Sequence, residues 1–421
     1  MARLSGQPRR RVGGAAGISV APDNSAERLS RFVNLARTQG NDLALPFRFG
    51  PNIYLAQTQP GFEGVAWEEI AASFKDASEA YRAGPFEGVR ELGRRNVPDR
   101  AGITIFTAPR PEPLRLLRTS EDVFAVVGYR HGLSGDPPAL ERIAAIAREA
   151  PYVDQALAMR TRLMPGTRSG RRLRYRVIAR MAGGEHQFRR LDLVRAISRG
   201  IAERGDRSWR PSPIEADVEF WATLLLGELI LAIRLSDERM RHRDYKVAHL
   251  PGSLRPSAAA ALALLSKPMP EDVVLDPLCG AGTLLIERAH LGRYRLLIGC
   301  DRDATALSAA RENVGLRYKP LELHRWDAAA LPLPDRSIAK IITNLPWGIR
   351  HGSHEDNRRL YPRILQEFHR LLQPGGKIVI LTGETRLMSD LITRGLFRPD
   401  KILRASILGT NAAVYVSTAP S

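Results

Sequence analysis

The chain has 421 residues, which is enough for two or three hydrophobic cores, and it carries a formal charge of +18. Only seven of its 63 basic residues are lysine, and arginine pairs with phosphate and stacks on bases better than lysine does. Its 44% hydrophobic content, the lack of a membrane-spanning apolar run and the presence of two cysteines exclude disordered, membrane and disulfide-rich classes. We expect a soluble, cytoplasmic protein of several domains that binds a polyanion.

The N-terminal half begins with a segment rich in Gly, Ala, Ser and Arg. We expect a partly disordered tail at 1–45 that is not a secretory signal, because it lacks an apolar core. From about Asn52 a strand leads to a turn at Pro60-Gly61, and a helix begins near Glu63. Further apolar patterns predict a strand at 102–107, a helix at 139–150 and a β-hairpin over 218–235. A charged stretch at 236–246 then marks the main domain boundary.

Positive charge is concentrated between residues 160 and 210, which hold 15 arginines against four acidic residues. From Arg172 to Met181, apolar and basic residues alternate, which predicts a strand with one buried face and one arginine-rich face. Such a face can neutralise phosphates, although a charge run is also typical of a plain solvated surface. The candidate contacts in this region are Arg172, Arg174, Arg176, Arg180, Arg189 and Arg190.

Beyond residue 237, strand and helix patterns alternate regularly. Strands are predicted at 273–276, 296–301, 321–325, 338–344, 377–382, 401–408 and 412–417, and helices at 256–265, 283–290, 304–314, 357–372 and 387–395. This alternation indicates an α/β domain with a doubly wound, mostly parallel, Rossmann-like sheet. The last two strands have no helix between them, so we expect an antiparallel C-terminal hairpin.

A glycine-rich loop follows the first strand of this half, in the sequence Asp276-Pro277-Leu278-Cys279-Gly280-Ala281-Gly282-Thr283. Two glycines between a strand end and a helix start let a ligand approach the backbone closely. The loop lacks the Lys-Ser/Thr of a phosphate-binding P-loop, and it also lacks the three-glycine pattern of dinucleotide dehydrogenases. The sequence therefore predicts a small-molecule site of another kind.

Acidic residues end the next two strands. Asp301 is placed to hold a ribose diol through two hydrogen bonds, and Asp327 to meet an adenine amino group. Either Asp301 or Asp303 could instead cap the helix that begins at Ala304, and Asp327 could be a turn residue.

The fourth strand ends in Asn344-Leu345-Pro346-Trp347-Gly348. An amide oxygen, a rigid proline peptide and a large aromatic ring stand side by side in this sequence. An exocyclic base amine needs acceptors for its N–H groups and a ring for stacking, and this motif offers both. The alternative is a buried tryptophan beside a turn-forming asparagine.

With these motifs in place, the chain resembles THUMP-containing class I S-adenosylmethionine (SAM) RNA methyltransferases that act on amino groups. DPLCGAGT, CD after the second strand and NLPWG carry this resemblance in the C-terminal half. YLAQTQPGFEGVAWEEI, RYRVIARMAGGEHQFRRLDLVRAI and RHRDYKVAHLPGSLRPSAAAALALL carry it in the remainder, so that it covers about residues 50–417. The chain is most similar to tRNA guanine-N2 methyltransferases, with related rRNA enzymes close by.

The resemblance implies a domain order and a set of site residues. The implied segments are a tail at 1–45, a ferredoxin-like domain at 46–115, a THUMP domain at 116–236 that binds tRNA, and a methyltransferase domain at 237–421. The implied cofactor residues are Asp276, Cys279, Gly280, Gly282, Thr283, Asp301, Asp327 and Asn344, and the catalytic residues are Asn344, Pro346 and Trp347. Arg243 is similar to residues near an RNA entrance. Leu345 departs from the commoner proline at its position.

The resemblance implies transfer of a methyl group from SAM to the N2 amine of a guanine in tRNA, in the acceptor stem. An rRNA guanine-N2 enzyme, an adenine-N6 enzyme and a non-catalytic RNA-binding protein remain as alternatives. A sulfonium cofactor supplies its own electrophile, so we expect neither a metal nor a covalent nucleophile. His351, His354 and Glu355 are close in sequence, but they lack a cysteine partner and favour a substrate-side loop over a metal site.

Overall fold

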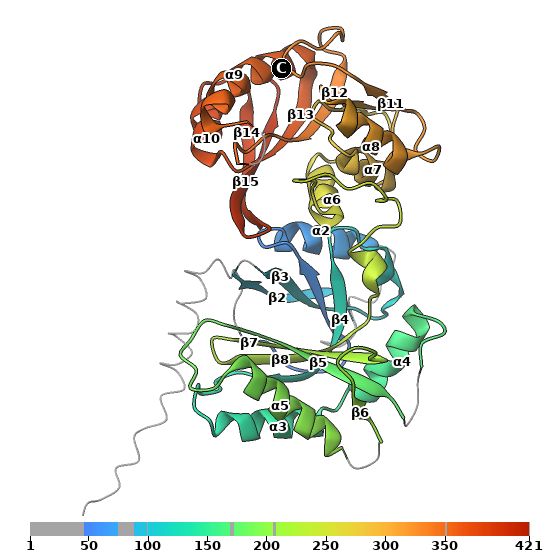
Figure 1. Cartoon of the computed structure of the whole chain (residues 1–421), viewed down its shortest axis with the longest axis vertical. Coiled ribbons are helices and arrows are strands. Elements are labelled where there is room, and N and C mark those ends of the chain that lie inside the picture. The colour runs from blue at the N-terminus through green and yellow to red at the C-terminus, as the bar shows by residue number, and fades with distance from the viewer. Residues whose placement is uncertain are drawn as a thin grey trace, which may run out of the picture.

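The computed structural model describes residues 46–74, 88–98, 100–168, 172–204, 208–349 and 352–420, so the predicted tail at 1–45 lies outside it. Two β-sheets form the centres of two stacked units, which we call the N-terminal unit (residues 46–236) and the C-terminal unit (residues 237–420). Figure 1 shows the N-terminal unit below and the C-terminal unit above, with helices α2 (Glu63–Ser73) and α6 (Pro256–Leu265) between the two sheets.

The N-terminal unit is built on an eight-stranded sheet with the order β2-β3-β1-β4-β8-β7-β5-β6. Its strands are β1 (Ile53–Thr58), β2 (Arg90–Val97), β3 (Ala101–Thr107), β4 (Asp122–Arg130), β5 (Arg174–Ala182), β6 (Arg210–Pro211), β7 (Val218–Leu225) and β8 (Glu228–Arg234). Its remaining helices are α3 (Ala139–Glu149), α4 (Val153–Leu163), α5 (Arg190–Ala202) and the 3-10 helix η2 (Glu112–Leu116). A second 3-10 helix, η3 (Glu238–Met240), lies at the start of the C-terminal unit. The predicted hairpin at 218–235 is confirmed as β7 and β8.

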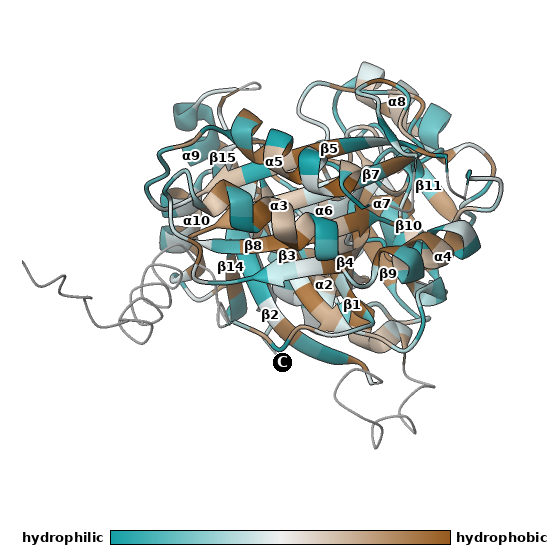
Figure 2. Ribbon diagram, turned by 90° about the horizontal axis from the view of Figure 1, so that it is seen from below, coloured by the Kyte–Doolittle hydropathy of each residue, from teal (hydrophilic) through white to brown (hydrophobic). Residues whose placement is uncertain are grey.

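One continuous sheet joins the two segments that the sequence assigned to separate N-terminal domains. Strand β4 lies between β1 and β8 and pairs antiparallel with both. All six residues of β1 are buried, because alternate side chains enter two different apolar clusters on the two faces of the sheet. In Figure 2, which is coloured by hydropathy, hydrophobic residues make up most of β8. The ranges 46–115 and 116–236 therefore share a common core.

The C-terminal unit contains a seven-stranded sheet with the order β11-β10-β9-β12-β13-β15-β14. Its strands are β9 (Val273–Asp276), β10 (Leu296–Cys300), β11 (Leu321–His324), β12 (Ile338–Asn344), β13 (Leu372–Thr382), β14 (Arg398–Ile407) and β15 (Thr410–Thr418). Strands β9 to β13 are parallel, and the β14–β15 hairpin adds antiparallel pairing against β13. The predicted doubly wound α/β fold with an antiparallel C-terminal hairpin is confirmed.

Helices cover both faces of this sheet. They are α6, α7 (Thr283–His290), α8 (Ala304–Val314), α9 (His354–Leu371) and α10 (Thr385–Ile392). The first three match the predicted ranges, because their ends are defined by local signals such as Pro256, Gly282 and the cap at Asp303. Helix α9 begins three residues earlier than predicted, since Ser353 and Asp356 form a capping box.

Helix α6 joins the two units. Nine of its ten residues are buried, which is unusual for a helix in a two-layer unit and follows from its position between α2, α7 and β13. Phe62 and Val65 of the N-terminal unit pack into the same apolar cluster as the alanines of α6. Beside this contact, Glu121 accepts hydrogen bonds from Arg255 and Ser257 across the interface. The N-terminal unit is therefore packed directly against the sheet that carries the predicted site.

Candidate functional site

A cavity of about 630 Å³ lies at the carboxyl edge of the parallel strands. Strand order reverses between β9 and β12, which are neighbours in the sheet, and open α/β sheets bind ligands at such a switch point. The predicted site residues that line the cavity are Asp276, Cys279, Gly280, Thr283, Asp301, Asp327, Asn344, Pro346 and Trp347. The fold thus brings together three motifs that are up to about 70 residues apart in the chain.

The glycine loop leaves open space beside its backbone. Gly280 has a φ of +50°, and an added Cβ there would meet nothing within 4 Å. Gly282 has a φ of +78° and caps helix α7, so both positions favour glycine. The Oγ1 of Thr283, one residue later, is buried without a hydrogen-bond partner in the described part of the chain. An orphaned hydroxyl facing a cavity is typical of a ligand site.

Two cysteines near the loop are structural. Cys279 and Cys300 are buried, and the Cys279 amide donates to the Cys300 carbonyl at 2.8 Å. Burial raises the pKa of both thiols, that of Cys300 to about 12, so neither is poised as a nucleophile. Cys279 contributes to the cavity wall by packing.

Asp276 is buried at the end of β9. Burial raises the pKa of its carboxyl to about 8, with a smaller contribution from the charge of Asp301. One of its oxygens accepts the Leu278 amide at 3.3 Å. A cationic ligand group placed here would favour the ionised form and lower this pKa.

The three acidic side chains after β10 and β11 have separate roles. Asp301 accepts from the backbone amides of Gly280 and Asp303, each at 3.0 Å, and so links the glycine loop to the end of β10. Asp303, not Asp301, is the helix cap, because it accepts the Thr305 amide at 2.8 Å. Asp327 is exposed and accepts the Ala329 amide at 2.9 Å, so it is a turn residue that also lines the cavity.

The motif after β12 is ordered by its own side chains. The Trp347 Nε1 donates to the Asn344 Oδ1 at 3.1 Å, so the amide oxygen and the ring predicted to hold a base contact each other. Gly383 lies under the indole, where an added Cβ would come within 2.8 Å of the ring. The amide oxygen keeps a second lone pair for a ligand donor.

A buried network fixes the peptide of the same motif. The Pro346 carbonyl accepts from the Tyr361 hydroxyl at 2.6 Å and from the Asn357 Nδ2 at 3.0 Å. Glu384 in turn accepts from Asn357 at 3.1 Å. Because the Pro346 carbonyl is already engaged, it is not free to accept from a ligand amine.

Leu345 has a structural explanation for its departure from proline. Its amide donates to the Leu381 carbonyl at 3.0 Å and extends the β12–β13 pairing by one residue, which proline could not do. Its side chain is fully buried in the apolar cluster beneath the sheet. The substitution therefore leaves the loop tied to the sheet.

Several cavity residues were not predicted from the sequence. The linker at 250–254, Trp326, Ile349 and the hairpin tip at 407–410 also line the cavity. Asn313 of α8 positions the linker. Its Oδ1 accepts from the Ala248 amide, and its Nδ2 donates to the carbonyls of Ala248 and Ala281. Trp326 could have been found from the sequence, because it is an aromatic residue next to the predicted site residue Asp327. The linker and the hairpin tip reach the cavity only through tertiary folding.

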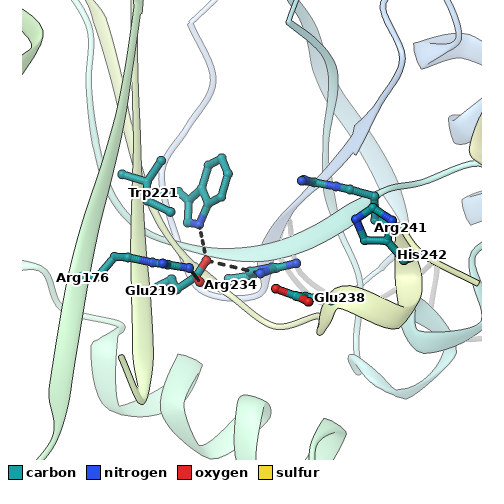
Figure 3. Close-up of a pocket in the computed structure, with 8 residues that line it drawn as sticks. Arg176, Glu219, Trp221, Arg234, Glu238, Arg241 and His242 are labelled. Atoms are coloured by element: carbon teal, nitrogen blue, oxygen red, sulfur yellow. Dashed lines mark hydrogen bonds and ion pairs between the residues drawn. The ribbon is translucent and has the colours of Figure 1, made fainter. Parts of the chain in front are cut away.

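The arginines of β5 lie on the N-terminal sheet, beside a polar cavity of about 350 Å³ (Figure 3). Arg176 pairs with Glu219, and Arg174 pairs with Glu215 and Asp217. Although burial acts to raise the pKa of Glu219, hydrogen bonds from Trp221 and Arg176 lower it overall. The arginine-rich face predicted for this strand is thus partly neutralised. The acidic partners follow residue 210 in the sequence and were not included in the charge count over 160–210.

Other predicted RNA contacts occupy different environments. Arg172, Arg189 and Arg190 are exposed. Arg180 is partly buried, since its guanidinium lies 4.5 Å from the Trp221 ring centroid and donates to Gln57 at 2.7 Å. Burial lowers the pKa of Arg180 to about 10.

Arg243, predicted near an RNA entrance, lies in the contact between the two units. Its side chain is only 10% exposed and lies between the two units, where it donates to the Arg118 carbonyl at 2.9 Å. The buried Glu287 lies 3.7 Å from its Nε and accepts from the Tyr245 hydroxyl at 2.7 Å. Arg243 therefore stabilises the contact between the units.

Neither a metal cluster nor a membrane-spanning helix is found among the residues that the structure describes. His354 contacts Glu384 at 2.7 Å through its Nδ1, which orders the start of α9. His351, its predicted neighbour, is outside the described ranges.

Comparison with known proteins defines the class of the C-terminal unit. Residues 243–410 match the family described as UPF0020, RMKL-like, methyltransferase domain. The fold is similar to the crystal structure of TrmN from Thermus thermophilus, with a TM-score of 0.67 and 25% identity, covering 87% of this chain and 99% of that one. The C-terminal unit has the fold of class I methyltransferase domains, as the motifs predicted.

Curated relatives are more specific. The tRNA (guanine(6)-N(2))-methyltransferase THUMP3 of Mus musculus is 30% identical over 260 residues, covering 58% of this chain and 51% of that protein. The tRNA (guanine(6)-N2)-methyltransferase of Thermus thermophilus is 32% identical over 230 residues, covering 52% and 65%. The chain thus spans about half the length of the first of these relatives. The resemblance inferred from its motifs is confirmed.

Proposed function

We propose that this protein transfers a methyl group from SAM to the N2 amine of a guanine in tRNA, in the acceptor stem. The observation that carries the proposal is the Asn344–Trp347 motif, held rigidly beside the glycine loop in one cavity. The guanine-N2 activity in the names of the curated relatives supports the choice of base and RNA.

The residues around the glycine loop fit SAM. The orphaned Thr283 hydroxyl and the open space beside Gly280 offer room and a polar partner for the methionine part. Each Asp301 oxygen accepts one backbone amide and keeps a lone pair for a ribose hydroxyl. When bound, SAM would supply an electrophilic methyl group on a sulfonium, with S-adenosylhomocysteine as the leaving group. The chain's own residues bind and orient the base, and the amine gives up one proton to water after the transfer.

Catalysis then depends on acceptors for the target amine. The Asn344 Oδ1 holds one N–H, and the Leu345 carbonyl holds the other because the Pro346 carbonyl is engaged by Tyr361 and Asn357. These hydrogen bonds strengthen as positive charge develops on the amine nitrogen. Trp347, fixed by Asn344 and by Gly383, stacks on the base.

Binding of the RNA falls to the N-terminal unit in this proposal. The ranges 46–115 and 116–236 would act as the ferredoxin-like and THUMP parts, and the exposed Arg172, Arg189 and Arg190 would contact phosphates. A guanine paired in a stem must first leave the stack, which costs roughly a few kcal/mol. Contacts to the RNA backbone repay that cost.

Incubation of the purified chain with tritiated SAM and bulk tRNA, followed by nucleoside digestion, tests the proposal. We expect the label in N2-methylguanosine. Label in N6-methyladenosine would indicate the adenine alternative, and cofactor binding without any methylation would indicate a non-catalytic RNA-binding protein. Parallel incubations with rRNA and U6 snRNA separate the RNA classes, since a 32% identical relative from Bos taurus is named a U6 snRNA (guanine-N(2))-methyltransferase.

A further inference from the structure

The β14–β15 hairpin reaches the cavity from the far end of the sheet. Strand β15 runs antiparallel to β13, with Ala413 opposite Thr382 at the carboxyl end of β13. The turn at 408–409 therefore projects beyond the edge where the parallel strands end. Figure 1 shows the hairpin extending from the C-terminal unit towards α2. Its tip contributes Ile407, Leu408 and Thr410 to the cavity wall.

Leu408 is an apolar side chain left in an exposed position. It is 54% exposed and has a φ of +52°, a conformation that leucine rarely adopts. Ile349, from the loop after Trp347, is 68% exposed and lines the same cavity. Two of the exposed large apolar side chains in the described part of the chain therefore line one cavity, where a bound ligand would cover them.

The N-terminal unit fixes the position of this hairpin. The Ser406 amide donates to the Pro60 carbonyl at 3.0 Å. Gly61 has a φ of +97°, and an added Cβ there would lie 2.1 Å from the Arg404 carbonyl oxygen. Such a close backbone approach requires glycine. The turn in the QTQPGFEG segment therefore holds the hairpin at the cavity.

We propose that Leu408 forms the substrate-side wall of the cavity, against which an unpaired purine base packs when Trp347 stacks on it. This inference rests on the proposed function and names a residue that positions the base. The cofactor is assigned to the glycine loop and Asp301, which supply its polar partners. The hairpin tip offers an apolar surface, which suits the face of a base.

Leu408→Ala tests the wall, and Ile402→Ala is its matched control. Ile402 is also 54% exposed and lies on β14, but it does not line the cavity. The full chain, saturated with S-adenosylhomocysteine (SAH), is titrated with a single-stranded oligoribonucleotide carrying one 2-aminopurine, whose fluorescence reports stacking. The kcat/KM for bulk tRNA and the SAH affinity are measured on the same preparations.

We expect Leu408→Ala to weaken oligonucleotide binding and to lower kcat/KM by about fivefold or more, as for loss of a buried apolar contact. SAH affinity should stay within about twofold, and Ile402→Ala should match the wild type in all three measurements. If the two variants have equal oligonucleotide affinity and equal kcat/KM, Leu408 does not contact the base and the proposal is wrong. A wild-type chain that binds the oligonucleotide without methylating RNA overturns the proposed function, while the two binding constants still decide the role of Leu408. A chain that does neither overturns both.

Discussion

The cavity at the edge of the C-terminal sheet and the polar cavity beside the N-terminal sheet hold their charged groups in opposite ways. Over the C-terminal sheet, the Asp301 carboxylate is held by two neutral backbone amides, which leave its charge available to a ligand. Over the N-terminal sheet, Glu219 is held by Arg176 and Trp221, with Arg234 close by (Figure 3). A guanidinium cancels the charge that it orders. Polar groups ordered by the backbone are therefore the better candidates for chemistry, and those ordered by an opposite charge are the better candidates for structure.

Asn344→Ala should give the largest effect, because it removes an acceptor that the cavity over the C-terminal sheet keeps available. We expect turnover on tRNA to fall by about 10²–10³, the range for loss of one positioned transition-state hydrogen bond. Methyl incorporation measures turnover, and calorimetry with SAH checks that the cofactor still binds. Full activity of this variant would show that the motif does not hold the reacting amine.

Asp301→Asn should reduce SAM affinity by about 10–100-fold. A hydrogen bond to a charged group contributes about 1.5–3 kcal/mol, and each 1.4 kcal/mol is tenfold in affinity. The new amide would also direct a donor at the Gly280 or Asp303 amide. Asp303→Asn is the control, since asparagine caps a helix as well as aspartate does. Equal affinities for the two variants, measured by calorimetry, would contradict the ribose assignment.

Glutamine substitutions at Arg176 in β5 and at Arg172, two residues before β5, compare a paired arginine with an exposed one. We expect Arg172→Gln to lower the slope of log tRNA affinity against log salt by about one. Arg176→Gln should change this slope less, because Glu219 already neutralises its guanidinium. Filter binding across a salt series measures both. If the triple change at Arg172, Arg174 and Arg176 leaves affinity and slope unaltered, RNA does not bind this strand.

Proton binding at Asp276 gives a prediction about stability rather than activity. Its native pKa of about 8 lies above the value of an unfolded aspartate, so the native state keeps a proton that the unfolded state releases above about pH 4. The stability contributed by this proton is therefore lost as pH rises towards 8. We expect the free energy of unfolding of the wild type, relative to Asp276→Asn, to fall between pH 5 and 8. A pH-independent difference in urea denaturation would contradict the raised pKa.

Local signals predicted much of the C-terminal unit and its site. Helices α6, α7 and α8 match the predicted ranges, and the three motifs of the site all reach the cavity. These features depend on glycines, prolines, caps and apolar periodicity within short segments, which a sequence displays directly. The order strand, glycine loop and helix is sufficient to place Asp276 and Gly280 at the edge of the sheet.

Contacts between distant segments were decided by the tertiary structure alone. Parallel pairing of β5 with β7 sets Arg176 opposite Glu219. The number of charged residues between 160 and 210 gives no information about this pairing. Packing between the units likewise buries Arg243 against Glu287 and brings the hairpin tip at 407–410 into the cavity. The sequence by itself determined which groups can do chemistry, because backbone signals are local. The fold decided which of those groups remain free, because a charge is neutralised by whichever neighbour the sheet register and the packing of the units bring to it.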